Sequence, residues 1–237
     1  MSAAAPATTP LTGLCARLRA CRSGVAMTEF ALSLPLLFGV GLYGIEAANL
    51  ATTQMKLSQV AIHIADNASR IGDTSMLQDR KIYESDINDV FIGSNLQAGD
   101  AIDLYEHGRV IISSQEVVPD SDDDQYIHWQ RCLGKKAYTS AYGDEGTGLL
   151  GGFAGMGPPG EEVLAFDGEA VIFVEVAYEY QPLVGDTFAF KRELRAIASF
   201  TVRDSRDLTQ IYQRDPSDPS TVARCSDYTG VSSDVFS

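Results

Sequence analysis

Residues 24–45 read Gly24-Val-Ala-Met-Thr-Glu-Phe-Ala-Leu-Ser-Leu-Pro-Leu-Leu-Phe-Gly-Val-Gly-Leu-Tyr-Gly-Ile45, and this stretch decides how the chain is organised. From Val25 to Ile45 the only charged residue is Glu29. As a helix these residues would extend roughly 31 Å, close to the ~30 Å hydrocarbon core of a bilayer. A helix that is apolar on every face is typical of a membrane span. The stretch therefore predicts a transmembrane helix.

The residues before this stretch predict its orientation. Met1–Gly24 contains Arg17, Arg19 and Arg22 but no acidic residue. Basic residues beside a span stay in the cytoplasm. We therefore expect a cytoplasmic leader over residues 1–24, a span over residues 25–48 in a bacterial inner membrane, and a periplasmic remainder.

A secretory signal peptide is the alternative interpretation. Its apolar region should be about 7–15 residues long and should end at a small-x-small cleavage site. The run here is longer, and it holds Glu29 near its start and Pro35 in its middle. Gly39-Val-Gly41 and Ala47-Ala48 nevertheless offer cleavage sites, so this alternative stays open.

A short motif surrounds Glu29. Four residues separate Gly24 from Glu29-Phe30, and the sequence continues Ala-Leu-Ser-Leu-Pro-Leu-Leu. Behind an arginine-containing leader, this pattern resembles the class III prepilin signature and the start of the TadE-like pilus-assembly family. That family supplies minor pilins or pseudopilins of the tight-adherence (Tad) pilus, a type IVc pilus. The resemblance implies that a prepilin peptidase cuts between Gly24 and Val25, that Glu29 and Phe30 form an assembly motif, and that other pilins and Tad assembly proteins are partners.

The patterning after the span predicts one long helix followed by a folded domain. From Ala47 to Ile71 there is no Gly or Pro, and apolar residues recur at three- and four-residue steps. We expect a helix from Val25 to Ile71, with a helix extension over residues 49–72 and a periplasmic domain over residues 73–237.

Alternating apolar residues in the second half of the chain predict an antiparallel sheet. The expected elements are a short helix over Ser85–Ile92, a hairpin of Ala101–Tyr105 with Arg109–Ser113, and strands over Tyr126–Cys132, Glu169–Tyr180 and Ala196–Arg203. In the strand Glu169–Tyr180, Val174 and Val176 share one face and Glu175 and Glu179 share the other. The predicted fold class is α+β and pilin-like, with an irregular tail from Asp204.

Charge and cysteine content restrict the partners and the compartment. The net charge of the chain is −14, and because the leader holds three arginines and no acid, residues 25–237 carry −17. Nucleic acid is a poor partner for such a surface. Cys15 and Cys21 fall in the leader, where thiols stay reduced. Cys132 and Cys225 fall in the periplasmic part, where an oxidising compartment favours a disulfide between them.

Some short motifs match patterns of enzymes or metal sites, but they lack the residues or flanking elements that such sites require. Asp120–Asp124 lacks the Gly and Glu positions of a calcium loop. Gly146–Gly151 matches G-x-G-x-x-G but has neither a strand before it nor a helix after it. We therefore read the Gly-rich residues 143–160 as a mobile exposed loop, and the three histidines form no zinc pattern. We expect no enzymatic activity, no cofactor, no metal and no small-molecule substrate.

Three interpretations of function are compatible with these patterns. The first is a minor pilin or pseudopilin that takes part in assembly of an adhesive Tad-type pilus. The second is an uncleaved single-span envelope protein whose acidic periplasmic domain is a binding or scaffold module. The third is a periplasmic enzyme, which stays open because absence of motifs is weak grounds for exclusion.

Overall fold

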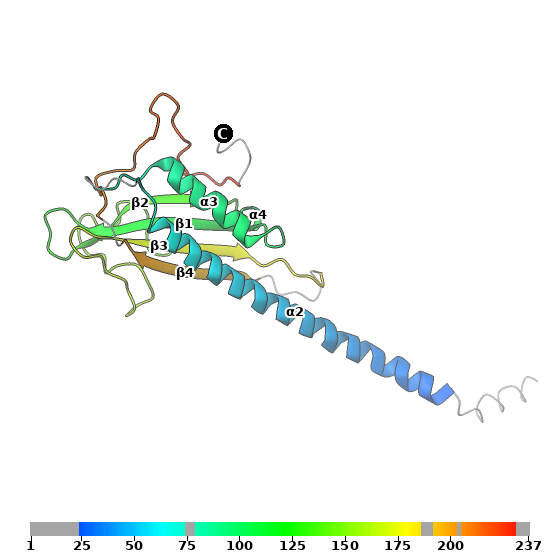
Figure 1. The fold of residues 1–237 in the computed structure, drawn as a ribbon. Helices are drawn as coiled ribbons and strands as arrows, with labels where there is room; N and C mark the ends of the chain where they lie inside the picture. Colours follow the sequence, from blue (N-terminus) through cyan, green and yellow to red (C-terminus); the bar gives the residue numbers. More distant parts are fainter. Residues whose placement is uncertain (1–23, 74–78, 186–191, 203–204, 231–237) are drawn as a thin grey trace, which may run out of the picture. The chain divides into compact units, whose positions relative to one another are not determined.

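A computed structural model describes residues 24–73, 79–185, 192–202 and 205–230. The chain divides into two compact units, Met1–Ala47 and Ala48–Ser237. The described elements are α2 (Val25–Ala68), α3 (Glu84–Ala98), α4 (Leu104–His107), β1 (Gly108–Val117), β2 (Gln125–Leu133), β3 (Ala170–Glu179) and β4 (Glu193–Thr201) (Figure 1). The strands form one antiparallel sheet in the order β2-β1-β3-β4, so the predicted α+β class is confirmed.

Helix α2 is continuous over 44 residues, which confirms the predicted long helix. It ends at Ala68, three residues before the expected end, because the chain turns at Ser69 and Arg70. The Ser69 hydroxyl donates to the Asp66 carbonyl (2.7 Å) and so satisfies a free carbonyl at the helix end. In the second unit, the helix buries a stripe at three- and four-residue spacing: Leu57, Val60, Ala61, Ile64, Ala65 and Ala68.

The main hydrophobic core lies between this stripe, α3 and one face of the sheet. Side chains of the central strands β1 and β3 supply that face, with Val110 opposite Val176 and Ile112 opposite Val174. Trp129 of β2 joins the same cluster. The strands predicted over 126–132, 169–180 and 196–203 are confirmed as β2, β3 and β4, although β4 starts three residues earlier than expected.

Two sequence predictions between residues 85 and 113 differ from the structure. The predicted hairpin is wrong: Leu104–His107 forms the short helix α4, and β1 pairs with β2 and β3 instead. Ile102, Leu104 and Tyr105 are all buried, which fits a helical turn and not the alternation of a half-exposed strand. The helix predicted over Ser85–Ile92 is longer, because α3 continues to Ala98.

The second face of the sheet is covered by the segment between β2 and β3. Ile127, Met156 and Phe173 form a small apolar cluster there, with Tyr142, Phe153 and Val163 packed against it. The expectation that residues 143–160 are an exposed loop is therefore wrong in part. Gly155–Gly157 is buried against the sheet, whereas Leu149, Leu150 and Pro158–Gly160 are exposed.

Buried polar side chains of the sheet fix this covering segment. Gln115 Nε2 donates to the Val163 carbonyl (2.7 Å), and the Met156 amide donates to Gln115 Oε1 (2.8 Å). Glu175, expected on the face away from the core, is also buried. It accepts hydrogen bonds from Tyr138 Oη (3.0 Å), Ser140 Oγ (2.5 Å) and the Ala141 amide (2.9 Å). Gln115 and Glu175 are thus both matched by polar groups of the segment that covers them.

The chain after β4 has no regular element in residues 205–230, as the sequence predicts. The buried guanidinium of Arg109 binds this tail by donating to the carbonyls of Cys225 (2.7 Å) and Asp227 (3.0 Å). The ring of Tyr228 lies 4.2 Å from the Arg109 guanidinium carbon. Cys132 and Cys225 are joined by a disulfide, so the tail is held both covalently and by hydrogen bonds.

Candidate functional site: the N-terminal half of α2

The first half of α2 is the part of the chain with the strongest functional signal. Its most apolar window of 18 residues has a mean hydropathy of 1.7, and none of that window is buried. Large apolar side chains are exposed throughout it, including Met27 (74%), Leu32 (80%) and Leu36 (70%). This helix is long and apolar enough to span a membrane.

The polar side chains inside this half are satisfied within the helix. Thr28 Oγ1 donates to the Val25 carbonyl (2.8 Å), and Ser33 Oγ donates to the Phe30 carbonyl (3.1 Å). Such bonds remove the cost of placing a free hydroxyl in hydrocarbon, where no water is present. Glu29 is the one ionisable side chain in the first two turns of α2.

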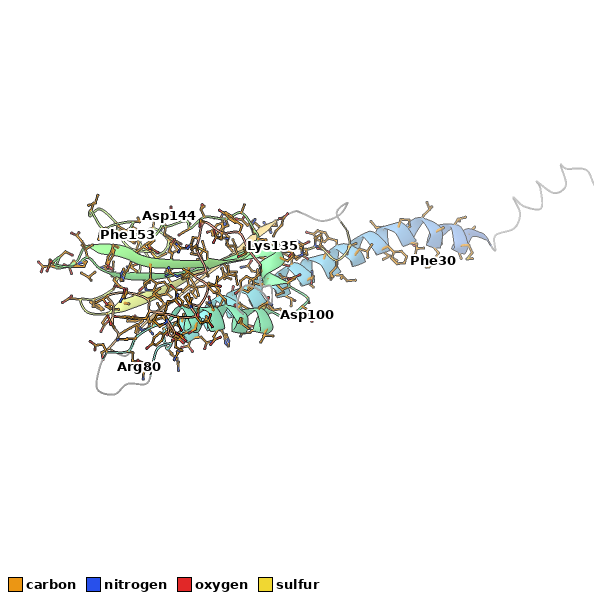
Figure 2. All side chains as sticks on the ribbon, turned by 90° about the horizontal axis from the view of Figure 1, so that it is seen from above. Phe30, Arg80, Asp100, Lys135, Asp144 and Phe153 are labelled. Carbon is orange, nitrogen blue, oxygen red and sulfur yellow. A yellow bond between two sulfur atoms is a disulfide. The ribbon has the colours of Figure 1, made fainter. Side chains whose placement is uncertain are left out.

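The structure brings two of the four predicted motif residues together. Val25 is the first residue of α2 and follows Gly24 directly. Glu29 lies four residues later, so the two side chains share a helix face with their Cβ atoms ~5–6 Å apart. Phe30 occupies the adjacent face and is 57% exposed (Figure 2). The leader residues Arg17, Arg19, Arg22, Cys15 and Cys21 lie outside the described residues.

The folded unit, Ala48–Ser237, has fewer features that indicate a metal-binding or ligand-binding site. No group of three or more His, Cys, Asp or Glu side chains could hold a metal within the ranges described above. A polar groove of about 570 Å³ beside Cys225 is lined by Glu84, Arg131 and Glu145, among others. One of its two arginines is paired: Arg131 Nη2 lies 2.5 Å from Glu84 and its Nη1 lies 3.5 Å from Glu145. The groove is also lined by Arg224 and Asp144, so it holds charges of both signs.

Sequence reasoning missed the buried polar layer on the second face of the sheet. Gln115, Gln125, Gln130 and Glu175 are each at least nine-tenths buried, and each bonds the covering segment. Burial against Glu175 raises the pKa of Tyr138, whose hydroxyl would lose its proton beside an existing negative charge. The alternation of residues along a strand identifies which side chains share a face of the sheet. It does not indicate which segment covers that face.

No family model, curated protein or solved structure matches this chain. The resemblance to TadE-like proteins therefore depends on the sequence pattern alone, which is strongest over residues 17–48.

Proposed function

We propose that this protein is a minor pilin or pseudopilin that takes part in the assembly of a Tad-type pilus. A prepilin peptidase would cut it after Gly24 at the inner membrane. One observation carries the proposal: in α2, Glu29 is the only charged residue from Val25 to Ile45, in an otherwise apolar and exposed stretch of helix. Pilin-like subunits need such a helix because they stack it in the filament core.

The chemistry of the motif explains why an acid would be kept in this helix. A carboxylate inside a span costs ~2.5–3.5 kcal/mol on insertion scales. Cleavage would free a positively charged amine on Val25, on the same helix face as Glu29 or facing Glu29 of a neighbouring subunit. Pairing the two charges offsets much of the cost of burying each one in a low-dielectric bundle. The pair would thus favour the transfer of a processed subunit from bilayer to fibre.

The continuity of α2 supports the same role. The helix that holds the motif also supplies the core stripe from Leu57 to Ala68 without a break in its secondary structure. A subunit held through its apolar half would therefore display its acidic domain outside the membrane.

The first test is the intact mass and N-terminal sequence of the protein, extracted from membranes of cells that express its own pilus genes. We expect the mature chain to start at Val25. A start at Met1 or Ser2 would instead give an uncleaved anchored protein. A start near Ala48 would give a secreted domain, and either result overturns the proposal.

The second test is Glu29→Gln, which keeps the side-chain size and removes the charge. We expect normal membrane insertion but at least about tenfold less pilus, since a pairing of ~1.4 kcal/mol corresponds to a factor of ten. Asp100→Asn, which removes an exposed charge from the folded unit, is the matched control. Normal piliation of Glu29→Gln cells would contradict the assigned role of Glu29.

The second candidate function is an uncleaved single-span protein whose acidic domain binds an envelope partner. The net charge of −17 after the leader favours it, because such a domain attracts basic surfaces. Retention of residues 1–24 in the mature protein would distinguish it from the pilin.

A further inference from the structure

Four large apolar side chains are exposed on the segment that covers the second face of the sheet. The exposed fractions are 50% for Leu149, 101% for Leu150, 56% for Leu164 and 72% for Phe166. Loop tips of a soluble domain usually carry small or polar residues, and clustered exposed apolar groups mark interaction sites. Packing within the folded domain therefore does not explain why these four apolar side chains are exposed.

The backbone beneath these side chains is fixed by hydrogen bonds. The Ile127 amide donates to the Thr147 carbonyl (2.9 Å), and the Gly146 amide donates to the Ile127 carbonyl (2.7 Å). The Ala165 amide donates to the buried Gln125 Oε1 (2.8 Å). Leu149 and Leu150 thus follow one anchored point, and Leu164 and Phe166 flank another.

These anchored points meet at the start of β2, together with the acidic loop. Gln125 Nε2 donates to the carbonyls of both Asp123 and Ala165 (3.1 Å each). A Cβ on Gly148 would lie 2.3 Å from the Gln125 carbonyl oxygen, which shows how closely the Leu149 loop approaches the same residue. Figure 2 places Phe153 of this segment at the opposite end of the sheet from Lys135.

We name this surface the acidic-apolar platform. Its exposed residues are Asp122, Asp123, Asp124, Leu149, Leu150, Glu161, Leu164, Phe166 and Asp167.

Basic residues are scarce in the sequence segments that form the platform. The sequence has no Lys or Arg from residue 110 to 130 or from residue 137 to 190. The cations of β2 are both paired: His128 with Glu116, and Arg131 with Glu84 and Glu145. A local excess of acids around apolar side chains attracts groups that are both basic and apolar.

We propose that the acidic-apolar platform is a docking surface for a polypeptide segment that carries Lys or Arg beside large apolar side chains. The apolar tips supply contact area, and the acids select the charge of the partner. A second copy of the platform is disfavoured as occupant because its acids would face acids. The proposal goes beyond the pilin role and does not depend on cleavage at Gly24.

The test uses the full chain in nonionic detergent and a fluorescent synthetic peptide in which lysine alternates with leucine. Anisotropy titrations should show saturable binding that weakens as salt rises, since the charge attraction is screened. A lysine–glycine peptide and a glutamate–leucine peptide should bind at least about tenfold more weakly, because each lacks one of the two required features. Empty micelles provide the background.

A pair of double variants assigns the binding to the platform. Leu150→Ser/Phe166→Ser should weaken binding of the lysine–leucine peptide about tenfold or more, from the lost apolar contact. Ile62→Ser/Leu96→Ser removes apolar side chains that are 48% and 77% exposed elsewhere, on α2 and α3, and should leave binding within about twofold. Far-UV circular dichroism checks that both variants fold.

Several results would overturn the proposal. These are equal binding of the lysine–glycine peptide, equal losses in both double variants, or no saturable binding at all. Self-association of the full chain that Leu150→Ser/Phe166→Ser abolishes would identify a second copy as the occupant and would also overturn it.

Discussion

His128 and Glu116 form a partly buried ion pair at the end of the sheet where β2 begins. His128 Nδ1 lies 2.9 Å from Glu116 Oε2, and the other oxygen of Glu116 accepts a hydrogen bond from Ser114 Oγ (2.7 Å). The bond to Glu116 raises the pKa of His128 above its usual value of 6.5, with a smaller contribution from the charge of Glu145. The folded state therefore holds the His128 proton more tightly than the unfolded chain.

The sign of this shift predicts a pH dependence of stability. The contribution of the pair is complete below the unfolded pKa near 6.5 and is lost as pH rises through the higher folded pKa. Glu116→Gln should lower the free energy of unfolding by about 1–3 kcal/mol at pH 6 and by less at pH 8.5. Urea unfolding of the full chain at both values measures this, with Asp100→Asn as the control. An equal loss at both pH values would assign Glu116 a packing role instead.

Single residues were the level at which sequence reasoning was weakest. Alternation along β3 correctly placed Val174 and Val176 opposite Glu175, but it gave no sign that Glu175 is buried. The reason is that its partners, such as Tyr138 and Ser140, come from an irregular segment that no period describes. Burial of a polar residue depends on tertiary neighbours, which a local pattern does not contain.

Long periodic elements were predictable, because their patterns repeat over many residues. The stripe from Leu57 to Ala68 identifies the core half of α2, and the alternation in β3 identifies a central strand. The short run Ala101–Tyr105 was misread, since a few apolar residues fit a strand and a helical turn equally well. The Gly-rich segment has no period at all, so only the structure shows that it packs on the sheet.

Close packing of the Gly-rich segment can be tested with two glycines. Gly148 (φ +92°) and Gly151 (φ +86°) both have a conformation that side chains rarely adopt, so alanine strains each by ~1–2 kcal/mol. Only Gly148 is also crowded, because its Cβ would lie 2.3 Å from the Gln125 carbonyl oxygen, whereas nothing lies within 4 Å at Gly151. Gly148→Ala should therefore destabilise by about 1–3 kcal/mol more than Gly151→Ala, as measured by chemical denaturation. Equal losses of stability in the two variants would mean that this segment is not closely packed against β2.

At the scale of the whole molecule, two surfaces of opposite character share one chain. The first half of α2 is apolar on every face, whereas the domain after it carries most of the acids behind the net charge of −14. Sequence alone predicted this division, since composition and length decide it. The membrane and pilus roles remain proposals that depend on the motif at Gly24–Phe30.

The tail of the molecule is tied to the sheet by one covalent bond and by hydrogen bonds, including those of Arg109 and of the Cys132 and Gly134 amides, and these restraints predict how loss of the disulfide acts. Cys132 and Cys225 are separated by 93 residues, for which the chain-entropy model gives roughly 4–5 kcal/mol. Because Arg109 donates to the Cys225 and Asp227 carbonyls, it should keep part of the tail docked after reduction. We therefore expect Cys132→Ser/Cys225→Ser to lower the free energy of unfolding by about 2–4 kcal/mol without unfolding the sheet. Guanidinium unfolding measures the loss, and Cys15→Ser/Cys21→Ser, in the leader, should change nothing. An unchanged midpoint in the first variant would show that hydrogen bonds, those of Arg109 among them, hold the tail without the disulfide.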